Sequence, residues 1–187
     1  MSVLVFVIVV AVSYLMGCVN GAYYLAKHVA GKDIRQFGSQ NAGARNAGRL
    51  LGKWGFAGTV MIDAGKTLLA LEITNKVSGG NGYWLVFAAF LVLVGHIWPL
   101  HLELRGGKGV VVYLAAALYF TPLSILVTAA ILAVLFAVFR RFTIPGLIAL
   151  ASIPVTTFIA GHPWIYTAGL LFMLAAVVYA HIAYNPV

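Results

Sequence analysis

The residues best suited to chemistry lie in one long polar stretch between apolar segments. Residues 31–55 contain six glycines and five basic residues. Glycine-rich backbone can turn successive N–H groups toward an anion, and arginines add fixed charge and forked donors. This composition predicts a phosphate-binding loop, although an ordinary solvated basic loop would have a similar composition. The side chains available for binding are Ser39, Asn41, Arg45, Asn46 and Arg49.

A second cluster of glycines and cations follows further along the chain. Residues 95–99 read Gly-His-Ile-Trp-Pro, and residues 105–109 read Arg-Gly-Gly-Lys-Gly. Two such clusters together favour a binding site over a simple basic loop. His181, with Tyr184 and Asn185, is a third polar position at the end of the last apolar segment, where a histidine is more often an ordinary interfacial residue than a functional one. The candidate phosphate ligands in the second cluster are Arg105, Gly107 and Lys108.

Asp63 and Lys66 are charged residues inside an apolar segment. A charge at the centre of a bilayer costs about 3 kcal/mol on insertion scales, so neither residue is expected to stand alone there. Because they are three positions apart, both lie on one face of a helix. We predict a structural ion pair that braces this helix against the polar loops, with a proton or ion path as the alternative.

No sequence feature predicts a cofactor, a metal site or a disulfide. Cys18 is the only cysteine, which excludes a disulfide framework within the chain. The acidic residues Asp33, Glu72 and Glu103 are too scattered along the sequence to predict a metal cage.

The elements that position these residues are predicted to be membrane helices. The chain is 63% hydrophobic and 9% charged, with a mean hydropathy of +1.00, which favours one all-α integral membrane domain over residues 1–187. A helix needs about 20 residues to cross a hydrocarbon core of about 30 Å. We predict about seven transmembrane helices, of which the fourth is short for a full span. They cover residues 3–25, 56–73, 84–100, 110–120, 123–139, 143–160 and 164–182.

The basic residues indicate which side of the membrane each loop occupies, because lysine and arginine collect in loops that remain in the cytoplasm. The first, third and fifth loops carry most of them, so the amino terminus is predicted outside and the carboxyl terminus in the cytoplasm. The net charge of +8 is spread over these loops, which favours anionic headgroups or an anionic substrate over nucleic acid. The basic loop residues are Lys27, Lys32, Arg35, Arg45, Arg49, Lys53, Arg105, Lys108, Arg140 and Arg141.

Taken together, the motifs resemble those of the PlsY family of acyl-phosphate:glycerol-3-phosphate acyltransferases, small seven-span enzymes of the bacterial inner membrane. Residues 38–49 are similar to the family motif GSGNxGATNxxR. Residues 95–99 and 105–109 resemble the family pattern GHxxP followed by KGGKG. Residues 63–66 are similar to its DxxKG element, and His181 matches a histidine that follows the last span. The resemblance covers essentially the whole chain.

Several positions depart from these motifs, which indicates a divergent paralogue. Gln40 stands where the motif has glycine, Arg45 where it has threonine, and Arg105 where it has lysine. Near the carboxyl terminus, Tyr184 stands where an asparagine is expected, and Asn185 follows it. These departures leave the acceptor open between glycerol 3-phosphate and a related polar alcohol.

The resemblance implies transfer of a fatty acyl group from acyl phosphate to the 1-hydroxyl of glycerol 3-phosphate, giving lysophosphatidic acid and phosphate. Acyl phosphate is already activated, so the site must orient two phosphates, neutralise them and stabilise the carbonyl oxygen. The reaction would take place at the cytoplasmic face and would need no cofactor. An enzyme that produces acyl phosphate would be a partner, alongside membrane lipids.

A site made of cations and neutral donors suits this reaction. His96 or His181 would accept the hydroxyl proton, with the donor's own phosphate as an alternative acceptor. Ser39 is alternatively a covalent nucleophile, but the sequence places no histidine and acid beside it. Arg49 and Lys108 are expected to hold phosphate, joined by Arg45 and Arg105, while Ser39, Asn41 and Asn46 would bind acceptor hydroxyls or phosphate oxygens.

Two other classes of function remain open. A non-catalytic homologue that binds lipid phosphate or a partner enzyme agrees with the substitutions at Arg45, Arg105 and Tyr184. A small transporter of a phosphorylated metabolite would also use glycine loops and arginines. Such transporters usually contain internal repeats, and the single echo in this chain, between residues 95–99 and 161–164, falls on opposite sides of the predicted membrane.

Overall fold

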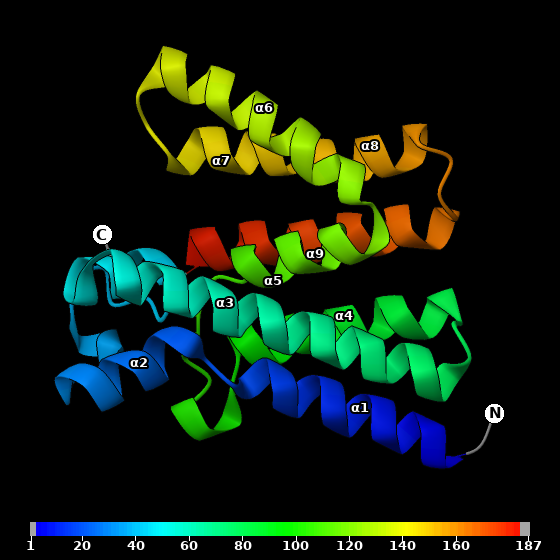
Figure 1. Ribbon diagram of the computed structural model, residues 1–187, viewed down its shortest axis with the longest axis horizontal. Helices are drawn as coiled ribbons and strands as arrows, with labels where there is room; N and C mark the ends of the chain where they lie inside the picture. Colours follow the sequence, from blue (N-terminus) through cyan, green and yellow to red (C-terminus); the bar gives the residue numbers. More distant parts are fainter. Residues whose placement is uncertain (1–2, 184–187) are drawn as a thin grey trace.

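The computed structural model describes residues 3–183, and every regular element in that range is a helix (Figure 1). The all-α prediction is therefore confirmed. The α-helices are α1 Val3–Cys18, α2 Gly21–Ala30, α3 Ala44–Ser78, α4 Gly82–Ile97, α5 Val110–Phe120, α6 Pro122–Phe139, α7 Thr143–Leu150, α8 Ser152–Ile159 and α9 Trp164–Ala183, with short 3-10 turns η1 at Ile34–Gln36 and η2 at Leu100–Leu102.

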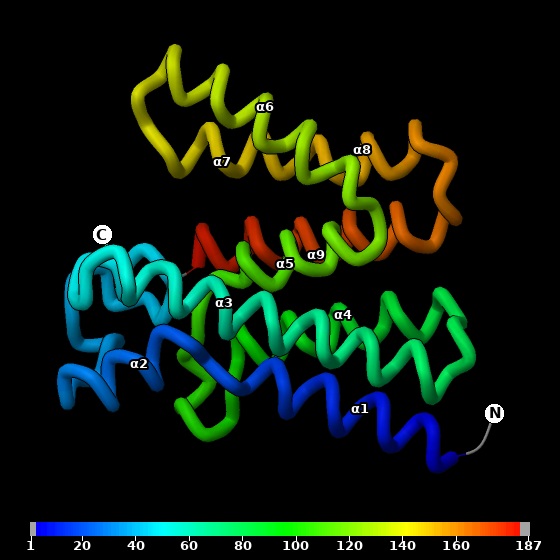
Figure 2. The backbone as a smooth tube through the Cα atoms, viewed as in Figure 1, coloured from blue at the N-terminus to red at the C-terminus, as the bar shows by residue number. Residues whose placement is uncertain are grey.

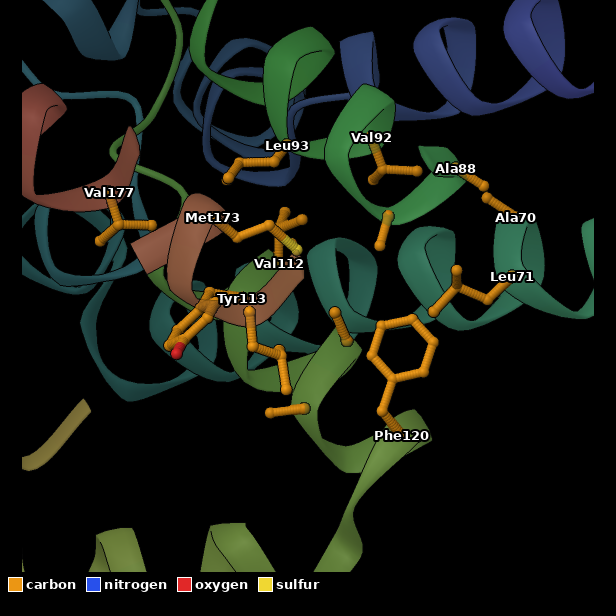
Figure 3. Packing of buried hydrophobic residues seen from close by; sticks show 14 of the residues in the cluster. Ala70, Leu71, Ala88, Val92, Leu93, Val112, Tyr113, Phe120, Met173 and Val177 are labelled. Atoms are coloured by element: carbon orange, nitrogen blue, oxygen red, sulfur yellow. The ribbon is translucent and has the colours of Figure 1, made fainter. Parts of the chain in front are cut away.

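Most of the hydrophobic core lies between α3, α4, α5 and α9, and it also includes Val9 of α1, Leu150 of α7 and Ile153 of α8. Figure 3 shows Leu71 of α3, Val92 of α4, Tyr113 of α5 and Met173 of α9 converging in this core. Helix α1 packs on the outside of α3 and α4, and α2 packs on α3. Helices α6, α7 and α8 pack on one another and join the bundle through α5 and α9, so that they form a separate layer in Figure 1.

Three helices in the described range are long and apolar enough to cross a membrane: Gly82–Leu102, Pro122–Phe139 and Trp164–Ala183. The pair α1 and α2 would supply a fourth span if it is taken as one helix bent by 43°. Helix α5 and the segment Thr143–Ile159 are apolar but shorter. The structure thus supports an integral membrane protein, with three or four clear spans where we predicted seven.

The first predicted helix, residues 3–25, is wrong as a single element, because it breaks between α1 and α2. The side chain of Asn20 accepts a hydrogen bond of 2.9 Å from the N–H of Tyr23 and so caps α2. Apolar residues continue on both sides of Asn20, so hydropathy alone does not reveal the break. The dipeptide Asn20-Gly21 was the signal that could have revealed it.

The predicted helix 143–160 is interrupted as well, at Ala151 between α7 and α8. Pro154 has no N–H with which to bond the carbonyl four residues earlier, at Leu150, and that residue ends α7. The hydroxyl of Ser152 donates instead to the carbonyl of Ala149, at 2.7 Å.

Helix α3 is much longer than the predicted segment 56–73, because it begins at Ala44 inside the polar stretch. Gly52 interrupts it with non-helical backbone angles, φ 70° and ψ −164°. Arg45 and Arg49, predicted in a loop, therefore lie on the first turns of a helix, four residues apart on one face.

The basic segments gather at one end of the bundle. Figure 2 shows α2, the start of α3 and the turn after α4 at the end opposite the start of α1. The turn between α6 and α7 lies toward the same end, and Arg45 joins it by a 3.3 Å hydrogen bond to the hydroxyl of Thr143. Helix α9 also ends there, at Ala183.

Candidate functional site at the basic end

Asn46 is the centre of the glycine-rich loop. Its Oδ1 accepts a 3.0 Å hydrogen bond from the N–H of Ser39. Its Nδ2 donates to the carbonyls of Ile34, Phe37 and Asn41 at 3.1, 2.8 and 3.1 Å. The side chain is buried and both ends of the amide are engaged, so we propose that Asn46 shapes the loop in place of the direct substrate contact expected from the sequence.

Gly38 allows this loop to close over Asn46. Its φ of +56° lies in the left-handed region, and a Cβ added there would lie 2.4 Å from Oδ1 of Asn46. The same Cβ would lie 3.7 Å from Cδ of Arg49, which shows that this arginine runs beside the loop. Arg49 is exposed, so its guanidinium is available at the surface.

An ion pair holds the other end of the loop against the turn after α4. Asp33 caps η1 and forms a 2.7 Å salt bridge with Arg35. The hydrogen bonds from Arg35 hold the pKa of the Asp33 carboxyl below its usual range. Arg35 also donates to the carbonyl of Leu102 at 2.6 Å. This link between residues 33–35 and η2 was not anticipated from the sequence.

The Arg105–Lys108 segment folds back onto the end of α4. The N–H of Gly106 donates to the carbonyl of Ile97, and the N–H of Gly107 donates to the carbonyl of His96, each at 3.0 Å. A Cβ on Gly106 would lie 2.0 Å from the carbonyl oxygen of His96, and a Cβ on Gly107 would lie 2.3 Å from Nε2 of the same residue. Both glycines are therefore required for the close approach of this backbone to α4.

A buried polar cluster lies behind the two loops. Nζ of Lys66 lies 3.0 Å from Oδ1 of Asp63 and 2.9 Å from Nδ1 of His96. All three side chains are buried. An ammonium group can only donate, so Nδ1 of His96 accepts, and the neutral imidazole carries its hydrogen on Nε2. The predicted pair of Asp63 and Lys66 thus includes a third member from α4.

This cluster also closes the break between α1 and α2. Lys66 donates to the carbonyls of Gly17, at 3.0 Å, and Val19. Asp63 accepts a 3.2 Å hydrogen bond from the N–H of Gly21. The end of α1 carries a partial negative charge and the start of α2 a partial positive charge, so each ion meets the helix end that stabilises it.

His181 lies near the end of α9. Its Nδ1 donates a 2.8 Å hydrogen bond to the carbonyl of Val177, because a carbonyl can only accept. The neutral ring therefore presents the lone pair of Nε2. The charges of Lys108 and Arg45 both act on this half-buried ring. Residues 105–109 pack on this part of α9, since a Cβ on Gly109 would lie 3.5 Å from Cγ2 of Val177.

Lys108 is partly buried in the second loop, and this burial lowers the pKa of its ammonium group from the ordinary value of 10.5. The next residue, Gly109, lies between α4 and α9, where a Cβ would meet Leu93, Ile97 and Val177. Tyr184 and Asn185, which follow His181 in the sequence, lie outside the described residues.

Arg105 lies on another side of the loops. It lines an open cleft of about 450 Å³ that neither Arg49, Lys108 nor His181 lines. Gln40 reaches this cleft from a left-handed backbone position, with φ 57°. The cleft is lined by Asp33, Arg35, Gln36, Gln40, Glu103 and Arg105.

Residues 3–183 contain no group of three or more His, Cys, Asp or Glu side chains placed to hold a metal ion. Among these described residues, buried side chains of both charges come together in the cluster of Asp63, Lys66 and His96.

Comparisons with known proteins place this chain in a family. The family model described as glycerol-3-phosphate acyltransferase matches residues 7–185. A glycerol-3-phosphate acyltransferase of Desulfitobacterium hafniense is 37% identical over 169 residues, covering 90% of this chain and 83% of that protein. One from Desulforudis audaxviator is 35% identical over 182 residues, covering 97% of this chain and 90% of that protein.

Two solved structures of PlsY, an integral membrane glycerol 3-phosphate acyltransferase, have the same fold. The glycerol 3-phosphate form superposes with a TM-score of 0.86 at 28% identity, covering 95% of this chain and 88% of that one. The lysophosphatidic acid form superposes with a TM-score of 0.83 at 26% identity, covering 94% and 87%. This chain therefore belongs to the glycerol-3-phosphate acyltransferase family.

Proposed function

We propose that this chain is an enzyme that moves a fatty acyl group from acyl phosphate to the 1-hydroxyl of glycerol 3-phosphate. The products would be lysophosphatidic acid and inorganic phosphate. The observation that carries this proposal is the packing of the second glycine-rich loop on α9, within a chain that belongs to the acyltransferase family. A Cβ on Gly109 would lie 3.5 Å from Cγ2 of Val177, the residue whose carbonyl holds Nδ1 of His181 and leaves its Nε2 lone pair available. The names of the relatives and the two forms of PlsY agree with this acceptor and this product.

The chemistry asks for charge and orientation more than for a strong nucleophile. The acceptor hydroxyl attacks the acyl carbonyl, a carbon–oxygen bond forms, and the bond between the carbonyl carbon and the phosphate oxygen breaks. The phosphate leaves with the electron pair. Lys108 and Arg49 are the proposed phosphate ligands, since cations lower the energy of phosphate groups as charge develops in the transition state. Ser39 and Asn41 are proposed to bind acceptor hydroxyls or phosphate oxygens.

We assign the proton of the acceptor hydroxyl to Nε2 of His181 rather than to His96. The Nδ1 of His96 already accepts from Lys66, and the ring is buried against Gly107. His181 is half-buried and its Nδ1–H is fixed by Val177, so the opposite nitrogen is the basic one. Transfer of the proton directly to the departing phosphate is the alternative that the His181 variant described below tests.

The membrane arrangement follows the charge pattern. We propose one domain over residues 1–187 with seven membrane segments in the bacterial inner membrane, the basic end toward the cytoplasm, the amino terminus outside and the carboxyl terminus inside. The gathering of the three basic segments at one end of the bundle supports this orientation. Glycerol 3-phosphate would enter from the cytoplasm, and acyl phosphate would come from the bilayer or from a partner enzyme that produces it.

The test uses purified protein in lipid nanodiscs with long-chain acyl phosphate, with and without glycerol 3-phosphate. Phosphate release and lysophosphatidic acid are measured together. We expect release that depends on the acceptor, and we expect Arg49→Ala and Lys108→Ala to abolish it. Arg141→Ala, an exposed cation in the turn between α6 and α7, is the matched control and should keep full turnover.

Two outcomes would favour other functions. Binding of glycerol 3-phosphate without any lipid product would indicate a non-catalytic binding homologue. Uptake of radiolabelled glycerol 3-phosphate into sealed proteoliposomes, again without lipid product, would indicate a transporter.

A further inference from the structure

The two glycine-rich loops of the candidate site are far apart in the sequence, yet both are attached to the buried cluster of Asp63, Lys66 and His96. The first loop is attached through Asn20, whose Nδ2 donates a 3.0 Å hydrogen bond to the carbonyl of Ala42. Asn20 lies in the break between α1 and α2, whose carbonyls and N–H group bind Lys66 and Asp63. The cluster therefore fixes the position of residue 42.

The second loop is attached to the same cluster through His96. The ring nitrogen Nε2 lies so close to Gly107 that a Cβ there would be only 2.3 Å away. The carbonyl of the same histidine accepts the N–H of Gly107. The ring itself is held from behind by Lys66, at 2.9 Å from Nδ1. Both the side chain and the backbone of His96 thus define where Gly107, and with it Lys108, can lie.

The loops also touch each other at this point. A Cβ on Gly107 would lie 2.8 Å from the carbonyl oxygen of Ala42. Ala42 and Gly107 are therefore in direct contact, with one held by Asn20 and the other by His96. Any shift of the imidazole ring would change the separation between Lys108 and the residues that follow Ala42, which include Arg45 and Arg49.

We infer that Lys66 and His96 are positioning residues for substrate phosphate, with Lys66 orienting the imidazole and the imidazole setting the distance between Lys108 and the arginines at the start of α3. This inference rests on the proposed acyltransferase function. It gives the buried ion pair a role in the reaction beyond bracing α3, and it gives His96 a role other than that of a base. Neither side chain would touch substrate.

The test compares three variants with the unaltered enzyme. His96→Asn keeps an acceptor at the place of Nδ1, facing Lys66, but removes the ring from Gly107. Gly107→Ala moves the loop from the other side and leaves the ion pair untouched. The third variant combines both changes. The matched control is His162→Asn, the same change at the opposite end of the bundle between α8 and α9.

We expect each single variant to keep its thermal midpoint in detergent near that of the control. The KM for glycerol 3-phosphate should rise, and kcat/KM should fall on the order of 10–100-fold, because the group that positions the substrate phosphate is displaced. In the double variant the loss should be smaller than the product of the two single losses, because the 2.3 Å collision with the ring is gone and only the 2.8 Å approach to the carbonyl oxygen of Ala42 remains. A loss clearly below that product would support coupling through the contact between His96 and Gly107.

The inference fails if KM per folded enzyme is unchanged while only the thermal midpoint falls, since that describes a purely structural residue. It also fails if the two effects multiply, since the residues would then act independently. Should His96→Asn not fold, an unchanged KM in Gly107→Ala is sufficient to reject it. An inactive unaltered enzyme would instead reject the proposed acyltransferase function, so the two failures are distinguishable.

Discussion

Nζ of Lys66 on α3 lies 2.9 Å from Nδ1 of His96 on α4, and both side chains are buried. This contact joins two helices behind the glycine-rich loops and makes the ion pair with Asp63 part of a larger cluster. Its energetic and catalytic consequences can be measured separately.

Lys66→Met should strongly destabilise the fold. The change leaves the carboxylate of Asp63 buried without its partner, and breaking a buried pair in this way costs about 3–5 kcal/mol. Lys76→Met is the matched control, because Lys76 pairs with Glu72 at 3.8 Å in an exposed position, where an ion pair contributes about 0–1 kcal/mol. Denaturant unfolding in mixed micelles measures both. Equal losses of unfolding free energy in the two variants would contradict the burial of the Asp63–Lys66 pair.

Asn46→Ala should lower activity through the shape of the glycine-rich loop. The variant leaves the N–H of Ser39 and three carbonyls without their partner, at a cost of about 1–3 kcal/mol per unsatisfied buried group. We expect kcat/KM to fall while helix content by circular dichroism is retained. Asn75→Ala, on the same helix but far from the loop, serves as control. Full activity in Asn46→Ala would show that the loop keeps its shape without the hydrogen bonds of this side chain.

His181→Gln tests the assignment of the base. General base catalysis typically contributes about 10²–10⁴-fold, so kcat should fall by that order while the KM for glycerol 3-phosphate changes little. His101→Gln provides the comparison, because that histidine lies at the same end but is bonded to the hydroxyl of Tyr24 at 3.1 Å. If kcat survives in His181→Gln, the departing phosphate takes the proton.

The pH dependence of acceptor binding should report Lys108. A lysine is charged below its pKa and neutral above it, and burial lowers the pKa of Lys108 from 10.5. The KM for glycerol 3-phosphate should therefore begin to rise at a less alkaline pH than an exposed lysine would require. Lys108→Arg should remove this rise, because guanidinium stays charged. A rise that is identical in Lys108→Arg and in the unaltered enzyme would assign it to another group.

Arg105→Gln should cost far less activity than Lys108→Gln. The cleft that Arg105 lines does not include Arg49, Lys108 or His181, so its loss leaves the proposed phosphate ligands in place. Turnover and the KM for both substrates, measured side by side, show which of the two variants loses more activity. Equal losses would mean that phosphate also occupies the cleft.

The sequence predicted those parts of the fold that local signals define. Residues 110–120 match α5, and 123–139 matches α6 within one residue, because Gly109 and the Thr121-Pro122 step mark their ends. Hydropathy did not reveal the break at Asn20 or the interruption at Ala151, since apolar residues continue through both. The helical start of α3 was missed because its residues are polar.

The two polar clusters and their position at one end of the bundle also follow from local patterns. The contacts and hydrogen bonds that connect these clusters do not follow from local patterns. The contact of His96 with Lys66 joins residues 30 positions apart, and the bond from Asn20 to Ala42 joins residues 22 apart. Spacing along one helix predicts which side chains share a face, but it contains no information about which face of another helix will meet them.

The close approach of Gly106 and Gly107 to α4 limits how this gene can vary. Every missense change at a glycine codon adds at least a Cβ, and at these two positions that atom would lie 2.0 and 2.3 Å from atoms of His96. No substitution, however conservative, avoids the collision. Gly65 and Gly146 have open space where a Cβ would go. In a library of random variants selected for function, we expect codons 106 and 107 to stay unchanged while codons 65 and 146 diversify.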